Sequence, residues 1–123
     1  MSRAARGARA RRRGRRAEAI AAWLLRLKGF RILARDLRLR TGEIDIVARR
    51  GGVIAFVEVK ARRDHAEAGE ALRHRQRARI MRTASAYLAQ RPDIQHLAPR
   101  FDAVLIGLGG WPRHVPDAWR DSP

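Results

Sequence analysis

The chain has 123 residues, with 28 lysines and arginines against 12 aspartates and glutamates, so its formal net charge is +16. This length fits one domain with a modest core. The absence of cysteine excludes disulfides and thiolate metal sites. No segment approaches the ~18 uninterrupted apolar residues that a membrane span needs. Nucleic acid is therefore favoured over a membrane as the partner of this basic chain.

The histidines show no spacing typical of metal ligands, and we expect them at the surface. They are His65, His74, His96 and His114. A structural zinc site is not expected.

Residues 1–16 contain eight arginines and no acid, which predicts a flexible basic arm ahead of a single domain over residues 17–123. The arm either contacts phosphates or only keeps the chain in solution. The arginines assigned to phosphate contact are Arg11, Arg12, Arg13, Arg15 and Arg16. Charged residues interrupt the apolar run that follows, which excludes a secretory signal and favours a cytoplasmic protein.

Apolar residues at three- and four-residue spacing predict an amphipathic helix over residues 17–28, ended by Gly29. Its expected buried stripe consists of Ile20, Trp23, Leu24 and Leu27. Glu18 lies in the first turn at the border of this stripe, where a carboxylate suits the helix dipole.

Three strands, a helix and a fourth strand are expected next. The strands cover residues 30–39, 43–48 and 53–61, the helix covers residues 70–90, and the fourth strand covers residues 100–107. Thr41-Gly42 and Arg50-Gly51-Gly52 provide the turns. Residues 111–123 form a tail with room for a short edge strand. The predicted order is αβββαβ.

Carboxylates and a lysine recur at two-residue spacing on adjacent predicted strands. Side chains alternate between the faces of a strand, so Glu43 and Asp45 share one face, as do Glu58 and Lys60 on the next strand. Such a hairpin favours a site for a hard cation and an activated water, which is the chemistry of phosphodiester cleavage. Glu18 is a further acid close upstream.

The same alternation has a structural explanation. Ile44 and Ile46 are expected on the opposite face from the acids, and this pattern also describes any half-exposed sheet. An acid-x-Lys spacing is by itself a weak signal. Both interpretations stay open from the residues alone.

Several motifs in order resemble a known family. They are G-E-I-D-I-V-A followed by F-V-E-V-K-A-R, G-R-R-A-E-A-I-A-A-W-L from Gly14, G-E-A-L from Gly69, A-Y-L-A from Ala86 and R-F-D-A-V from Arg100. Together they resemble the YraN family of uncharacterised bacterial proteins over roughly residues 15–118. That family is similar to archaeal Holliday-junction resolvases and to the restriction-endonuclease-like nucleases with a D…(D/E)-x-K site.

The resemblance implies an α/β fold of the restriction-endonuclease-like class, with a mixed central sheet flanked by helices. It implies that Asp45 and Glu58 bind Mg²⁺ or Mn²⁺, together with the Val59 carbonyl. Lys60 would orient or deprotonate the attacking water, and Glu18 would complete the site through a water or a second metal.

The second helix departs from the family pattern. Where K-x-x-R-I is expected, Gln76 replaces the lysine. A glutamine can donate a hydrogen bond to a phosphate but supplies no charge. The residues assigned to phosphate contact here are Arg73, Arg75, Gln76, Arg77 and Arg79. The alternative is a solvated helix face.

The predicted function is a divalent-metal-dependent endonuclease acting on DNA, with branched or distorted structures as expected substrates. A homodimer is implied by analogy alone. The rival functions are a non-catalytic module that binds DNA or RNA with the same fold, and an accessory protein that binds RNA or a ribosomal surface. The aromatic residues are expected to pack in the core, except Trp111 and Trp119, which either cover a sheet edge or meet a partner.

Overall fold

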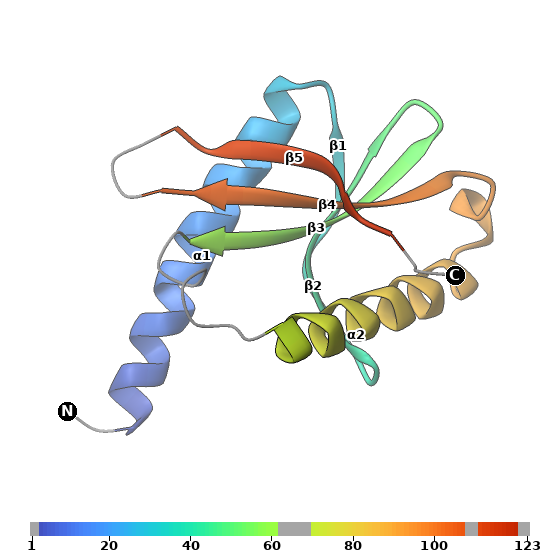
Figure 1. The fold of residues 1–123 in the computed structure, drawn as a ribbon. Helices are drawn as coiled ribbons and strands as arrows, with labels where there is room; N and C mark the ends of the chain where they lie inside the picture. The colour runs from blue at the N-terminus through green and yellow to red at the C-terminus, as the bar shows by residue number, and fades with distance from the viewer. Residues whose placement is uncertain (1–2, 62–69, 108–110, 121–123) are drawn as a thin grey trace.

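A five-stranded sheet lies between two helices in the computed structural model (Figure 1). The structure describes residues 3–61, 70–107 and 111–120, and the side chains of residues 14–60, 74–107 and 111–120. The elements are α1 (Arg3–Leu27), β1 (Arg31–Leu39), β2 (Gly42–Arg50), β3 (Val53–Ala61), α2 (Glu70–Ala89), the 3₁₀ turn η2 (Pro92–Ile94), β4 (Ala98–Ile106) and β5 (Arg113–Trp119).

The sheet is mixed, with strand order β1-β2-β3-β4-β5. The first three strands form an antiparallel meander, β4 runs parallel to β3, and β5 runs antiparallel to β4. The predicted class is confirmed: this is a restriction-endonuclease-like α/β fold. The tail contributes more than expected, because β5 is a seven-residue strand that follows the predicted αβββαβ order.

The helix α1 packs against one face of the sheet through Ala21, Ala22 and Leu25. The predicted buried stripe was largely wrong. Trp23 is 64% exposed and Leu27 is 80% exposed, and Ile20 is also exposed. Small alanine side chains allow the helix to approach the sheet closely, and this closeness selected the buried face. The apolar spacing of the sequence fits either face.

The same helix begins at Arg3, well before the expected start at residue 17. It therefore runs through most of the segment predicted to be a flexible arm. The side chains of residues 1–13 lie outside the described part, and the division into an arm and a domain stays a prediction.

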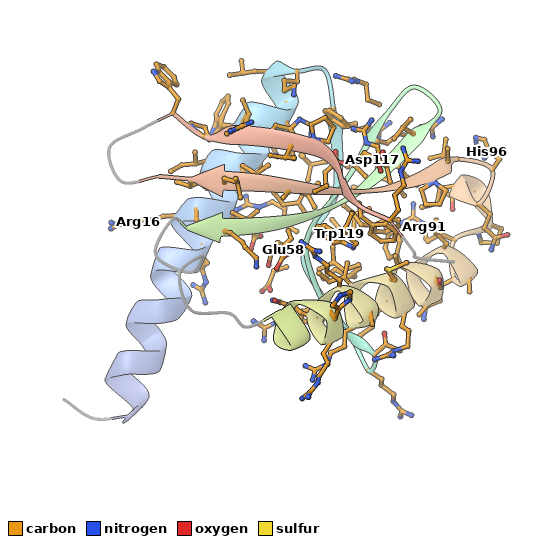
Figure 2. The ribbon with its side chains drawn as sticks, in the orientation of Figure 1. Arg16, Glu58, Arg91, His96, Asp117 and Trp119 are labelled. Carbon is orange, nitrogen blue, oxygen red and sulfur yellow. The ribbon has the colours of Figure 1, made fainter. Side chains whose placement is uncertain are left out.

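The helix α2 covers the opposite face of the sheet. Ile80, Ala84 and Tyr87 are buried against Phe56 and other residues of β2 and β3. At the far edge, Trp119 of β5 stacks on Phe101 with a centroid distance of 5.7 Å (Figure 2). One of the two tail tryptophans therefore covers the sheet, while Trp111 is exposed.

The surface prediction was wrong for His114, whose side chain is only 3% exposed. Its Nε2 lies 2.8 Å from Asp102 Oδ2 and its Nδ1 lies 2.5 Å from Lys28 Nζ. His114 is buried by contacts with Asp102 and with Lys28, which is far from it in the sequence. His74 and His96 are exposed as expected, and His65 lies outside the described residues.

Within the described ranges, neither helix has a segment long and apolar enough to cross a membrane.

Candidate functional site

The candidate site lies where β2 and β3 separate. The ladder between them runs from Arg50 and Val53 to Ile46 and Val57, whereas β2 stays paired with β1 as far as Gly42. Beyond Ile46, the side chain of Asp45 replaces the backbone as partner of β3. Its Oδ2 accepts a hydrogen bond of 2.8 Å from the amide of Val59.

This separation also breaks the regular alternation expected for β2. Ile44 packs in the cluster on the α2 side, and Ile46 packs in the cluster on the α1 side. The two isoleucines were predicted to share a face, which was wrong. The strand twists as it leaves β3, because the ladder that fixes alternation ends at Ile46.

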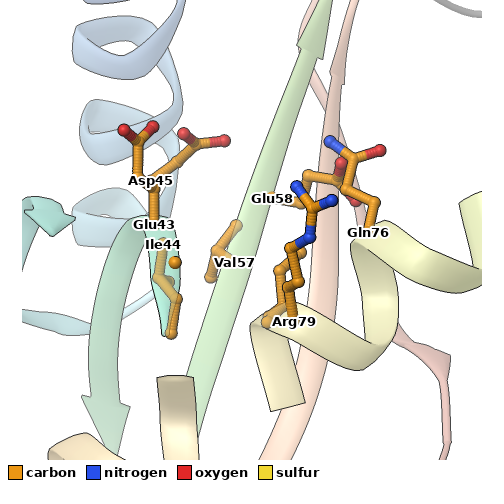
Figure 3. Close-up of a pocket in the computed structure, with 9 residues that line it drawn as sticks. Glu43, Ile44, Asp45, Val57, Glu58, Gln76 and Arg79 are labelled. Carbon is orange, nitrogen blue, oxygen red and sulfur yellow. The ribbon is translucent and has the colours of Figure 1, made fainter. Parts of the chain in front are cut away.

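A pocket of about 420 Å³ opens between the separated strands and α2. Figure 3 shows the carboxylates of Glu43 and Asp45 on one side, and Gln76 and Arg79 of α2 on the other side with Glu58. The remaining lining residues are Gly42, Ile44, Val57 and Ile80. Glu43, which the sequence placed on the same strand face as Asp45, lines the pocket with it.

Asp45 is the electrostatically unusual residue of this pocket. Burial raises its pKa to about 6, the hydrogen bond from Val59 opposes the rise, and the negative charges of Glu18, Glu58 and Asp36 add to it. A carboxyl group that is hard to ionise, because it is desolvated and has other acids nearby, gains from a bound cation.

Glu58 and Lys60 project from β3 as the two-residue spacing predicts. Lys60 Nζ lies 3.5 Å from Glu58 Oε1, and both side chains are largely buried. Glu58 faces the space between the sheet and α2 (Figure 2). An ammonium group is thus held beside the second carboxylate.

Glu18 approaches from α1 but does not line the pocket. Its Oε1 lies 3.4 Å from Arg35 Nε. Burial raises the pKa of Glu18, and Arg35 opposes that rise. Its charge still acts on Asp45. Arg35 is a residue that the sequence analysis missed, because only the packing of α1 against β1 brings it beside Glu18.

The described residues contain no group of three histidines or acids arranged to hold a metal ion by themselves. Mg²⁺ often binds through one or two carboxylates, several waters and a substrate phosphate. Asp45 and Glu58 fit that donor set, since both are oxygen donors on the wall of one open pocket. Glu18 is placed to act through its charge.

The residues assigned to phosphate contact fall into different places. Gln76 and Arg79 line the pocket. The guanidinium of Arg77 lies over the ring of Trp119 at 5.3 Å. Arg15, Arg16 and Arg75 are exposed. The side chains of Arg11, Arg12, Arg13 and Arg73 lie outside the described part.

Comparison with known proteins agrees with the resemblance found in the sequence. Residues 17–106 match Uncharacterised protein family UPF0102. The chain is 51% identical over 115 residues to the UPF0102 protein amb4503 of Paramagnetospirillum magneticum, covering 90% of this chain and 89% of the relative. It is 50% identical over 120 residues to the UPF0102 protein Mmar10_3014 of Maricaulis maris, covering 97% and 92%. The predicted YraN membership is confirmed: the chain belongs to the UPF0102 family.

Proposed function

We propose that the protein is a divalent-metal-dependent endonuclease that hydrolyses phosphodiester bonds in DNA, with branched or distorted DNA as its substrate class. The observation that carries this proposal is the half-buried Asp45 in an open pocket beside the Glu58–Lys60 pair, where burial first and then the charges of nearby acids raise its pKa. Mg²⁺ or Mn²⁺ is the proposed cofactor, held by Asp45 and Glu58 with the Val59 carbonyl as a third donor.

The bound metal would supply Lewis-acid polarisation of the phosphate and a more acidic water. Lys60 orients that water and stabilises negative charge as it develops on the phosphoryl oxygens. The reaction adds water across one P–O ester bond, so that the hydroxyl joins phosphorus and the proton ends on the leaving oxygen. Glu18 opposes the ionisation of Asp45 through its negative charge, and its own carboxylate pairs with Arg35.

The net charge of +16 supports a polyanionic substrate. Exposed arginines such as Arg15, Arg16 and Arg75 would contact the sugar–phosphate backbone without reading sequence. By analogy with resolvases, the proposal includes a homodimer, which would present two pockets to a branched substrate.

The test is cleavage of labelled single-stranded, duplex and four-way-junction DNA with Mg²⁺, Mn²⁺ or EDTA. Asp45→Asn keeps the shape of the side chain and removes its charge, and we expect it to lower cleavage by at least about 100-fold. Asp93→Asn is the matched control, because Asp93 is an exposed acid paired with Arg91 away from the pocket. Equal cleavage by the two variants would disprove the assignment of Asp45.

The second candidate is a module that binds DNA or RNA without cutting it. It is favoured by the lack, among the described residues, of a ready three-donor metal group and by the pairing of Glu18 with Arg35. Tight binding by wild type and Asp45→Asn, with no cleavage under any metal, would select this candidate.

A further inference from the structure

Arg79 occupies a position that separates it from the other arginines of α2. It lines the pocket together with Gln76, one turn earlier on the same helix face. No other lysine or arginine is among the described residues that line this pocket. In Figure 3 its guanidinium rises from α2 on the side opposite Glu43 and Asp45.

The turn between β1 and β2 fixes the base of this side chain. Thr41 Oγ1 lies 2.9 Å from Oγ1 of the fully buried Thr83, one turn after Arg79. At Gly42, where φ is +152°, an added Cβ would lie 3.0 Å from Thr83 Oγ1 and 3.6 Å from the Cβ of Arg79. The glycine therefore permits close contact between turn and helix, and this contact sets the position of Arg79 relative to β2.

The pocket carries charges of both signs, with Glu43 and Asp45 on the wall opposite Arg79 and Glu58 on the same side as Arg79. Glu43, Asp45 and Glu58 contribute three carboxylates. No ion pair joins Arg79 to them in the described part of the chain. With three carboxylates against one guanidinium, the pocket attracts a divalent cation and repels a free anion. A phosphate bound together with a divalent cation satisfies charges of both signs, because the cation meets the acids and the phosphate meets Arg79.

We infer that Arg79, assisted by Gln76, forms the phosphate-binding half of the pocket, contacting the phosphate that the metal also binds. This inference rests on the proposed function and deepens it. The guanidinium donates hydrogen bonds to the non-bridging oxygens, where a planar fork suits a phosphate better than a point charge does. The amide of Gln76 donates a further hydrogen bond without adding charge. Phosphate binding by Arg79 therefore depends on the cation.

The experiment compares Arg79→Gln and Arg79→Lys with Arg82→Gln. Arg82 is the matched control, since it is an exposed arginine that follows Arg79 by three residues on α2 and lies outside the pocket. Binding of a fluorescent DNA duplex and a four-way junction is measured in Ca²⁺ and in EDTA, and cleavage is measured in Mg²⁺. Because both positions changed are exposed, circular dichroism melting should be nearly the same for all three variants.

We expect Arg79→Gln to weaken DNA binding about 10-fold in Ca²⁺ and less than about 3-fold in EDTA. The cleavage rate at saturating DNA should fall by roughly 100-fold. Arg79→Lys should recover only part of the cleavage, since it restores charge without the fork. Arg82→Gln should weaken binding equally in Ca²⁺ and EDTA. An Arg79→Gln protein that behaves as Arg82→Gln does would overturn the inference.

The two proposals fail in different ways. If the wild type never cuts, the nuclease proposal fails, while the Ca²⁺-dependent difference between Arg79→Gln and Arg82→Gln still decides whether Arg79 binds phosphate beside a cation. If the wild type cuts and that difference is missing, only the role of Arg79 is lost.

Discussion

Two aspartates of the sheet, the buried Asp102 and the half-buried Asp45, have opposite electrostatic situations. Asp102 on β4 is fully buried and accepts hydrogen bonds from Arg100, from His114 and from the amide of Asp117. Burial alone raises the pKa of Asp102, but these three partners outweigh it and hold the pKa well below its ordinary value. Asp45 on β2 has one hydrogen bond donor, the amide of Val59, and three acids nearby, and its pKa rises to about 6.

The comparison shows that burial of an acid does not by itself indicate function. Asp102 is compensated inside the fold, and its partners join β4 to β5 across an irregular part of their ladder. Lys28 also reaches His114, which ties the end of α1 to the same group. Asp45 lacks such compensation, so its ionised form costs stability unless a cation from outside the chain supplies the missing charge.

The largest expected effect is the loss of Asp102. Asp102→Ala leaves Arg100 without its carboxylate and His114 without its acceptor, so we expect the free energy of unfolding to fall by about 3–5 kcal/mol. Urea unfolding followed by circular dichroism measures this. Asp93→Ala, at an exposed ion pair, should cost less than about 1 kcal/mol. A small loss in Asp102→Ala would mean that its network is dispensable.

Removal of the charge at Asp45 should have the opposite effect and raise the free energy of unfolding. Asp45→Asn keeps an acceptor for the Val59 amide and removes the repulsion from Glu18 and Glu58. We expect the free energy of unfolding to increase by on the order of 1–3 kcal/mol at pH 8 without metal. The same variant should not cleave DNA. If Asp45→Asn is less stable than the wild type, then Asp45 serves the fold as Asp102 does.

The pH dependence sharpens this contrast. The pKa of Asp45 in the folded protein, about 6, is above the ordinary value of 3.8 for an aspartate, so its protonated form favours folding. The wild type therefore loses stability relative to Asp45→Asn as pH rises from 4 to above 6. At pH 5 the difference should be about half of its pH 8 value. Unfolding curves of both proteins at pH 4, 5, 6 and 8 measure it.

Divalent metal provides the control for that series. Saturating Mg²⁺ at pH 8 should stabilise the wild type and leave Asp45→Asn nearly unchanged, because a ligand that binds only the folded state raises its stability. A difference that is flat across the whole pH range would show that Asp45 ionises as an ordinary surface acid does.

Much of the candidate site could be predicted from local sequence. The two-residue spacing of Glu58 and Lys60 places them on one face of β3 in the structure as it does in the sequence. The Gly51-Gly52 turn joins β2 to β3 as expected, so Asp45 and Glu58 reach the same pocket. The separation of the strands could not be predicted, since it depends on the Asp45 side chain replacing a backbone partner and on α2 packing beside it.

The sequence by itself determined the strand-forming segments, the acid-bearing hairpin, the family and the excess of positive charge. These follow from local spacing, turn residues and composition, which need no partner far along the chain. The buried face of α1 and the contacts of His114 with Asp102 and Lys28 could be known only from the tertiary structure. The same holds for the arginines of α2, where Arg79 lines the pocket whereas Arg77 lies over the ring of Trp119. Each of these depends on contacts between segments distant in sequence, where a residue's type permits several neighbours and packing selects one.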